Sequence, residues 1–142
     1  MAGGQAIDLA SVGKPLDESA LRDMHHRKTG ALLRASVMMG AACGEAAPDV
    51  LAALGRYGEA IGLAFQVIDD VLDVTQASAT LGKTAGKDAK ADKTTYVKLH
   101  GLDASRRYAR EYSDAAKAAL ARLPGGAPFL TALVEDMAKR TR

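Results

Sequence analysis

The sequence contains little of what several protein classes require. It has one cysteine and no tryptophan, and aromatic residues make up only 4% of its 142 residues. A single cysteine excludes a disulfide within the chain and fits the reducing conditions of the cytoplasm, where we place the protein. No apolar run is long enough to cross a bilayer and no signal peptide is recognisable, so we expect no stable membrane insertion.

A strong charge of either sign is also missing. The formal net charge is +2, which is too small to indicate nucleic-acid binding, and so few aromatic rings leave little for bases to stack on. We therefore expect no nucleic-acid partner. Hydrophobic residues make up 48% of the chain, enough for one globular domain with a core of its own. Cys43 stands between alanine and glycine, and we expect it to be a small core residue.

What the sequence does contain is helix-forming residues, because alanine, leucine, methionine, lysine, arginine and glutamate dominate and strand signals are nearly absent. We predict an all-α protein, a helical bundle in a single domain over residues 1–142. Pro15 with Asp17, and Pro48 with Asp49, mark two helix starts. After a glycine-rich start, the expected helices cover about 15–44, 48–74, 94–100, 103–123 and 127–139, and residues 76–93 form a loop.

Apolar residues recur at helical spacing in the first two of these helices. In the helix over 48–74 they step by three and four residues in turn, which predicts one long buried stripe. In the helix over 15–44 the same spacing predicts a buried face, and its methionines are expected to fill the core. The two expected faces comprise Leu21, Met24, Leu32, Ala35, Met39 and Ala42, and Leu51, Leu54, Gly58, Ile61, Phe65, Ile68 and Leu72.

Three carboxylates interrupt the apolar sequence near the end of the long helix, within Phe65–Val74. Asp69 and Asp73 are four residues apart and so lie one above the other, with Asp70 one step round. Acids on a packing face are costly unless a cation neutralises them, and acids near a helix C-terminus also oppose the helix dipole. The sequence therefore predicts a cluster of oxygen ligands for a hard divalent cation such as Mg²⁺.

Basic residues flank this cluster in the sequence. Lys28-Thr29-Gly30 lies on the preceding helix, while Lys83 and Lys93 follow the acidic helix. Acid clusters with several lysines suit a Mg²⁺-bridged phosphate. On the residues alone, Lys28 is more simply an ordinary exposed lysine, and Gln66 is a satisfied core amide as readily as a substrate contact.

Two further features leave alternatives open. Asp8 suits either the metal region or a helix terminus. His25 and His26 are adjacent and face different sides of a helix, so we expect no metal role for them.

In order and spacing, five segments resemble the trans-isoprenyl diphosphate synthases (polyprenyl synthetases), most closely the bacterial farnesyl diphosphate synthases. The acidic run resembles that family's second aspartate-rich motif. The other matches are Gly3-Gly4-Gln5-Ala6-Ile7-Asp8-Leu9, His26-Arg27-Lys28-Thr29-Gly30-Ala31-Leu32, Leu81-Gly82-Lys83-Thr84-Ala85-Gly86-Lys87-Asp88 and Lys93-Thr94-Thr95-Tyr96.

The resemblance implies the C-terminal half of the isoprenoid synthase fold and a Mg²⁺-dependent condensation of an allylic diphosphate with isopentenyl diphosphate. The implied roles are metal binding by Asp69, Asp70 and Asp73, diphosphate binding by Lys28, Lys83 and Lys93, and stabilisation of the allylic cation by Thr29 and Gln66, with Lys28 also catalytic. A homodimer is implied as well.

Members of the family carry two aspartate-rich motifs, and this sequence has one Asp-Asp pair, Asp69-Asp70. We therefore expect the first motif to lie outside these residues and the chain alone to have little or no prenyltransferase activity. Apolar faces left uncovered predict self-association. The alternatives are a non-catalytic subunit or remnant and a module that binds Mg²⁺-diphosphate; a terpene cyclase is less favoured, because its second metal motif is not found.

Overall fold

The computed structural model describes residues 1–79 and 93–140, with the side chains of 77–79 excepted. Every regular element in this described part is a helix, as predicted. None of its helices is long and apolar enough to span a membrane. The elements are α1 (Ala2–Ala10), α2 (Glu18–His25), the π-helix η1 (His26–Gly30), α3 (Ala31–Cys43), α4 (Pro48–Ala79), α6 (Tyr96–His100), α7 (Leu102–Leu120) and α8 (Pro128–Lys139).

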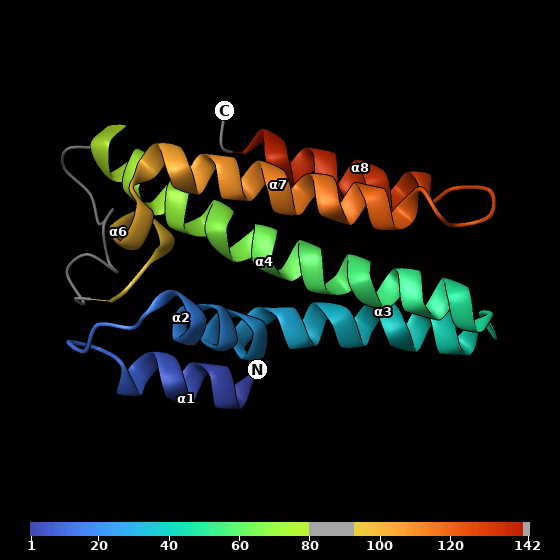
Figure 1. The fold of residues 1–142 in the computed structure, drawn as a ribbon, viewed down its shortest axis with the longest axis horizontal. Helices are drawn as coiled ribbons and strands as arrows, with labels where there is room; N and C mark the ends of the chain where they lie inside the picture. Colours follow the sequence, from blue (N-terminus) through green and yellow to red (C-terminus); the bar gives the residue numbers. More distant parts are fainter. Residues whose placement is uncertain (80–92, 141–142) are drawn as a thin grey trace.

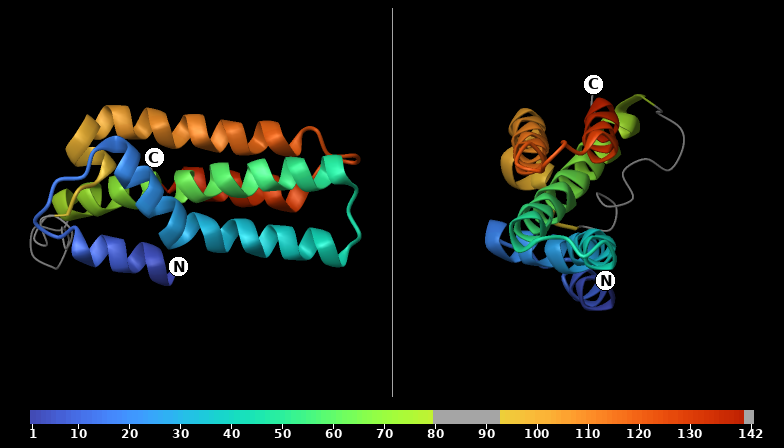
Figure 2. Two further views of the ribbon diagram at one scale, coloured as in Figure 1. Left: turned by 60° about the horizontal axis from the view of Figure 1, so that its bottom comes forward. Right: turned by 90° about the vertical axis from the view of Figure 1, so that its right-hand side faces the viewer.

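The long helix α4 lies at the centre of the bundle (Figure 1). It packs against α3 and η1 on one side and against α7 on the other, and α8 covers α7. The short helix α1 packs on the outside of η1 and α2, and α6 joins the end of α4 to α7. Figure 2 shows that α2, η1 and α3 follow one another beside α4, with a bend between α2 and α3; we call these three elements the first rod.

Capping residues set the helix starts that the sequence predicts. Asp17 accepts a hydrogen bond from the backbone N–H of Ala20 at 2.8 Å and so caps α2. Thr95 caps α6 in the same way, through the N–H of Lys98. Pro48 and Pro128 stand at the starts of α4 and α8, where a missing N–H costs nothing.

Two predicted boundaries were wrong. The glycine-rich start is helical, as α1, although glycine is a poor helix former; packing against η1 outweighs that propensity. Helix α4 continues past Val74 to Ala79, so the first residues of the expected loop over 76–93 are helical. The rest of that expected loop, residues 80–92, lies outside the described residues.

The π-helix η1 explains why the predicted buried face of the first rod fails after residue 30. A π turn inserts one extra residue, and therefore rotates every later side chain relative to the α-helical period. Leu21 and Met24, before η1, are buried as predicted, whereas Leu32 and Met39, after it, are 50% and 62% exposed. The residues of α3 that pack against the core are instead Leu33 and Val37.

Two expectations about core residues on α3 were also wrong. Cys43 is exposed and not a core residue, because it lies in the last turn of α3, which buries no residue. Met39 does not fill the core, for the reason just given, while Met24 does. The apolar side chains of α3 that remain exposed form an uncovered face on this side of the bundle.

The core is built around α4, whose predicted stripe is buried or half-buried along its length. Close backbone contact fixes its distance from the first rod: a Cβ on Gly62 would lie 2.6 Å from Cα of Gly30. Only glycine permits this approach, which seats the end of η1 directly on α4. The buried residues of α4 include Tyr57, Ile61, Ala64, Val67, Ile68 and Val71.

Candidate functional site

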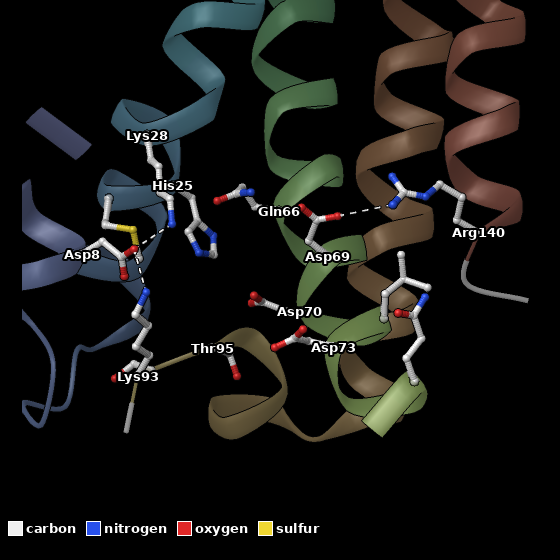
Figure 3. A pocket seen from close by; sticks show the side chains of 14 residues that line it. Asp8, His25, Lys28, Gln66, Asp69, Asp70, Asp73, Lys93, Thr95 and Arg140 are labelled. Atoms are coloured by element: carbon white, nitrogen blue, oxygen red, sulfur yellow. Dashed lines mark hydrogen bonds and ion pairs between the residues drawn. The ribbon is translucent and has the colours of Figure 1, made fainter. Parts of the chain in front are cut away.

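One cavity, of about 290 Å³, brings together most of the residues singled out in the sequence. It opens between α4 on one side and α1, α2 and η1 on the other, beside the segment that leads into α6 (Figure 3). Its lining residues are Asp8, Met24, His25, Lys28, Gln66, Asp69, Asp70, Leu72, Asp73, Gln76, Lys93, Thr94, Thr95 and Arg140.

Asp8, Lys28 and Lys93 form one side of the cavity, here named the lysine wall. The Nζ atoms of Lys28 and Lys93 lie 2.7 Å and 3.0 Å from the same oxygen, Oδ2 of Asp8. The three residues come from α1, η1 and the segment before α6, so this one carboxylate ties three parts of the chain together. The lysine side chains are 32% and 21% exposed, whereas that of Asp8 is only 5% exposed.

The charge state of Asp8 follows from these contacts. Burial alone would raise the pKa of its carboxyl, but the hydrogen bonds and positive charges of Lys28 and Lys93 outweigh burial and lower the pKa below its usual value. Asp8 is therefore ionised at neutral pH. It holds the two ammonium groups close together, although they would otherwise repel each other.

Asp69, Asp70 and Asp73 form the opposite side of the cavity, here named the aspartate wall. Asp70 Oδ2 accepts the backbone N–H of Tyr96 at 2.8 Å, which joins α4 to the start of α6. Asp69 Oδ1 lies 3.9 Å from a guanidinium nitrogen of Arg140, at the end of α8. Burial and the charge of Asp73 raise the pKa of Asp69, and the nearby positive charges of Arg140 and Lys28 offset only part of that rise.

The donor chemistry of the aspartate wall fits Mg²⁺. Carboxylate oxygens are the protein ligands that this ion prefers, and it is usually held by one or two carboxylates together with substrate phosphates. Among the described residues, no three acidic, histidine or cysteine side chains converge as a complete metal site. The wall therefore suits an ion whose remaining ligands come from phosphate and water, and Asp69, Asp70 and Asp73 remain its predicted ligands.

His25 lies between the two walls, where Figure 3 shows its ring beside Lys28 and directed toward the middle of the cavity. Its ring stacks on that of Tyr96, with centroids 5.7 Å apart and planes at 25°. Burial, with a smaller effect from the charge of Lys28, lowers the pKa of His25 to about 4. The imidazole is therefore neutral at physiological pH.

Backbone packing holds the segment that carries Lys28. A Cβ on Gly4 of α1 would collide with the backbone N and Cα of Lys28. On the other side, Gly62 of α4 contacts Gly30, as described above. The π-helix is thus packed between two glycines, one on α1 and one on α4.

Comparison with known proteins agrees with this arrangement. The model of the family described as polyprenyl synthetase matches residues 1–122. The chain belongs to this family. Farnesyl diphosphate synthase of Escherichia coli (strain K12) is 48% identical over 124 residues, which cover 87% of this chain and 42% of that protein. This polyprenyl synthetase chain thus spans less than half the length of that curated relative.

Solved structures of polyprenyl synthetases have the same helical arrangement. Decaprenyl diphosphate synthase from Rhodobacter capsulatus superposes with a TM-score of 0.87 at 29% identity, over 99% of this chain and 56% of that one. Geranyltransferase from Helicobacter pylori, in complex with magnesium and isoprenyl diphosphate, gives 0.77 at 31% identity, over 98% of this chain and 46% of that one.

Most of the predicted site residues lie around the cavity of this polyprenyl synthetase chain. Lys28, Lys93 and Gln66 line it together with the three aspartates, and Gln66 is 9% exposed. Thr29 is half-buried in η1 but does not line the cavity, so its predicted role stays a prediction. Lys83 lies outside the described residues.

The sequence reasoning missed what three other residues of this site do. Asp8, in the last turn of α1, is the shared counter-ion of the lysine wall and lines the same cavity as the three aspartates. The position of Asp8 within the glycine-rich segment was the only available signal. Neither His25 nor Arg140 was assigned to the site, and no spacing in the sequence marks either as a cavity residue.

Proposed function

We propose that this chain forms the diphosphate- and metal-binding part of a short-chain isoprenyl diphosphate synthase, of the farnesyl diphosphate synthase type. The reaction is the condensation of an allylic diphosphate with isopentenyl diphosphate, with Mg²⁺ as cofactor. In this proposal Lys28, Lys93 and Lys83 bind the allylic diphosphate, and Asp69, Asp70 and Asp73 hold Mg²⁺.

One observation supports the proposal above all others: a pair of lysines held by one buried carboxylate faces three aspartates across a single cavity. Binding a diphosphate requires positively charged groups, and binding a divalent cation requires oxygen ligands. The lysine wall provides the first and the aspartate wall the second, on opposite sides of one cavity. An ordinary surface loop of lysines would not hold two ammonium groups on a single shared oxygen.

The residues of the chain act on the leaving group. Ionisation of an allylic diphosphate leaves negative charge on the diphosphate, and Lys28 and Lys93 stabilise that charge because they are already held in place. Mg²⁺ supplies further charge stabilisation to the phosphate oxygens when it is bound. The side chain of Gln66, buried beside the aspartate wall, directs a carbonyl dipole toward the allylic cation, and the helical surroundings exclude water from it.

The chain alone is proposed to bind Mg²⁺-diphosphate rather than to complete the transfer. Its sequence provides one acidic cluster, whereas the condensation in this family uses two. A non-catalytic subunit that pairs with a full-length partner would use the same cavity. Whichever assembly forms, a homodimer or a pair with such a partner, these residues make the same contacts with diphosphate.

Calorimetry with inorganic pyrophosphate and Mg²⁺ tests the binding step. We expect heat of binding with the wild type, and affinity at least tenfold lower in Lys28→Ala and in Asp69→Ala, because each loses a charged contact to the ligand. Lys117→Ala is the matched control, since Lys117 pairs with Asp114 on α7 and does not line this cavity. Absence of binding by the wild type, or equal binding by all the variants, would reject the proposal.

Transfer of radiolabelled isopentenyl diphosphate separates binding from turnover. The 142-residue chain is expected to show little or no product while it still binds pyrophosphate. Turnover near that of intact relatives would show that one acidic cluster is enough and would overturn the restriction to binding.

A further inference from the structure

His25 is an enclosed polar ring whose chemistry the fold does not use. The residue is 4% exposed, and its Nδ1 atom is buried without a hydrogen-bond partner among the described residues. Buried polar atoms in folded proteins almost always have a partner, and leaving one unmet is costly. A stable protein therefore gains nothing from a nitrogen at this position.

The packing around His25 would accept an apolar ring equally well. Its contact with Tyr96 is a stacked ring contact, which phenylalanine can also make. The adjacent His26 is exposed and does not line the cavity, so a histidine at that place faces no comparable constraint. Of these two adjacent histidines, His25 is therefore directed into the site and His26 is not.

The Nδ1 atom of His25 has no hydrogen-bond partner among the described residues, and its ring lines the cavity beside the lysine wall. Asp8, the acidic residue of the lysine wall, already accepts hydrogen bonds from Lys28 and Lys93 at one oxygen. The imidazole is neutral, so one of its two nitrogens carries a hydrogen. No described group bonds to Nδ1 and determines whether that hydrogen lies on Nδ1 or on Nε2. An anion that reaches the lysine wall therefore lies beside the imidazole ring, whose nitrogen lacks a protein partner.

We propose that His25 is a ligand-binding residue of this cavity, which donates a hydrogen bond from its neutral imidazole to the diphosphate held by Lys28 and Lys93. This inference rests on the proposed function, since it takes diphosphate as the occupant of the cavity. It gives the buried nitrogen its partner only when ligand is present. His25 thus costs stability in the free protein and contributes affinity in the complex.

The test compares unfolding temperature and pyrophosphate affinity, measured with Mg²⁺ present, in the same set of variants. His25→Phe keeps a ring against Tyr96 and removes both nitrogens. We expect its unfolding temperature to equal or exceed that of the wild type, and its affinity for pyrophosphate to fall about tenfold, the effect of one hydrogen bond to a charged group. His26→Phe, the matched control, should leave the affinity unchanged.

Two amide variants distinguish loss of the nitrogen atoms from loss of the ring. Asparagine places its amide nitrogen near the position of Nδ1 and glutamine near that of Nε2, so at least one of His25→Asn and His25→Gln should recover part of the affinity. If neither does, or if His25→Phe lowers stability and affinity together, the ring has a packing role only and the inference fails. His25→Leu replaces the phenylalanine variant if that variant does not fold.

The two proposals fail in different ways. If the wild type binds pyrophosphate, Lys28→Ala abolishes binding and His25→Phe binds normally, then the diphosphate site stands and the role of His25 is refuted. If the wild type binds no pyrophosphate, the proposed function fails, and the inference about His25 fails with it.

Discussion

Among the acidic residues that the structure describes, Asp8 should be the one whose replacement by the matching amide, Asp8→Asn, destabilises the protein most. The carboxylate is 5% exposed and its Oδ2 atom accepts hydrogen bonds from Lys28 at 2.7 Å and from Lys93 at 3.0 Å. Asp8→Asn keeps the shape of the side chain but removes its charge. Two ammonium groups then remain close together with no anion between them.

The size of the effect follows from the exposure of the partners. A hydrogen bond to a charged group contributes about 1.5–3 kcal/mol, and removal of one member of a fully buried ion pair costs about 3–5 kcal/mol. Because Lys28 and Lys93 are 32% and 21% exposed, water partly screens both, so we take the lower end for each bond. The expected loss is about 3 kcal/mol, or roughly 10 °C in unfolding temperature for a domain of this size.

The pH dependence has a definite sign. The pKa of Asp8 is lower in the folded protein than its ordinary value of 3.8, because the lysines outweigh the effect of burial. The carboxylate therefore contributes stability that is complete above about pH 4 and is lost as the pH falls through the lower, folded-state pKa. The difference in unfolding free energy between wild type and Asp8→Asn should be constant near neutral pH and shrink in strong acid.

Thermal unfolding followed by circular dichroism at several pH values measures this difference. Asp23→Asn is the matched control, because Asp23 pairs with Arg27 at 2.7 Å while both side chains are more than half exposed, and its loss should cost under about 1 kcal/mol. Pyrophosphate should restore more stability to Asp8→Asn than to the wild type, since its oxygens replace the missing carboxylate between the lysines. Equal unfolding temperatures of Asp8→Asn and wild type at pH 7, or a difference that persists unchanged in strong acid, would refute the reasoning.

Two further predictions concern the packing of the first rod. Gly4→Ala should lower stability by about 3 kcal/mol, because its new methyl group collides with the η1 backbone. Gly3→Ala has open space around it and should raise stability by about 0.5 kcal/mol through helix propensity. Chemical denaturation measures both changes, and a stability change of the same sign in the two variants would contradict the proposed contact. Light scattering at rising protein concentration should detect self-association through the uncovered face of α3. The double variant Leu32→Lys, Met39→Lys should associate less, whereas Phe129→Lys on α8 should associate as the wild type does. A wild type that stays monomeric would contradict this prediction.

Local signals in the sequence predicted most of the helices. Asp17 and Pro48 mark helix starts by chemistry that acts within one turn, and the stripe of α4 follows from a period that needs no knowledge of its neighbours. Helix α1 escaped prediction because its stability comes from contact with η1 and not from its own glycine-rich residues. Its formation depends on tertiary packing that no window of the sequence contains.

The π turn shows why a helix can be predicted correctly while the residues predicted for its buried face are wrong. Residues 18–43 are helical, as predicted, but one added residue in η1 rotates α3 relative to α2. The π turn ends at Gly30, which packs closely against Gly62 of another helix, and no local window of the sequence contains that contact. The exposure of Leu32 and Met39 follows from that rotation, whereas Cys43 is exposed because it lies in the last turn of α3.

The site was predictable where its residues carry strong chemical signals. Three aspartates in an apolar helix, and lysines near glycines, indicate two groups of opposite charge from residue type and spacing alone. The contact that holds the lysines together was not predictable, because Lys93 and Asp8 are 85 residues apart in the sequence. His25 gave no signal, since its significance depends on the absence of a partner for Nδ1 within the described structure.

The opposed walls of the cavity have a consequence for the order in which ligands arrive. A lone magnesium ion approaching the aspartate wall is repelled by Lys28 and Lys93 across the cavity, and a lone diphosphate approaching the lysines is repelled by the three aspartates. Each ion therefore neutralises the charge that opposes the other. We expect positive thermodynamic coupling, in which saturating magnesium tightens pyrophosphate binding and pyrophosphate tightens magnesium binding by the same factor. The cavity thus selects the complex of the two ions over either ion alone.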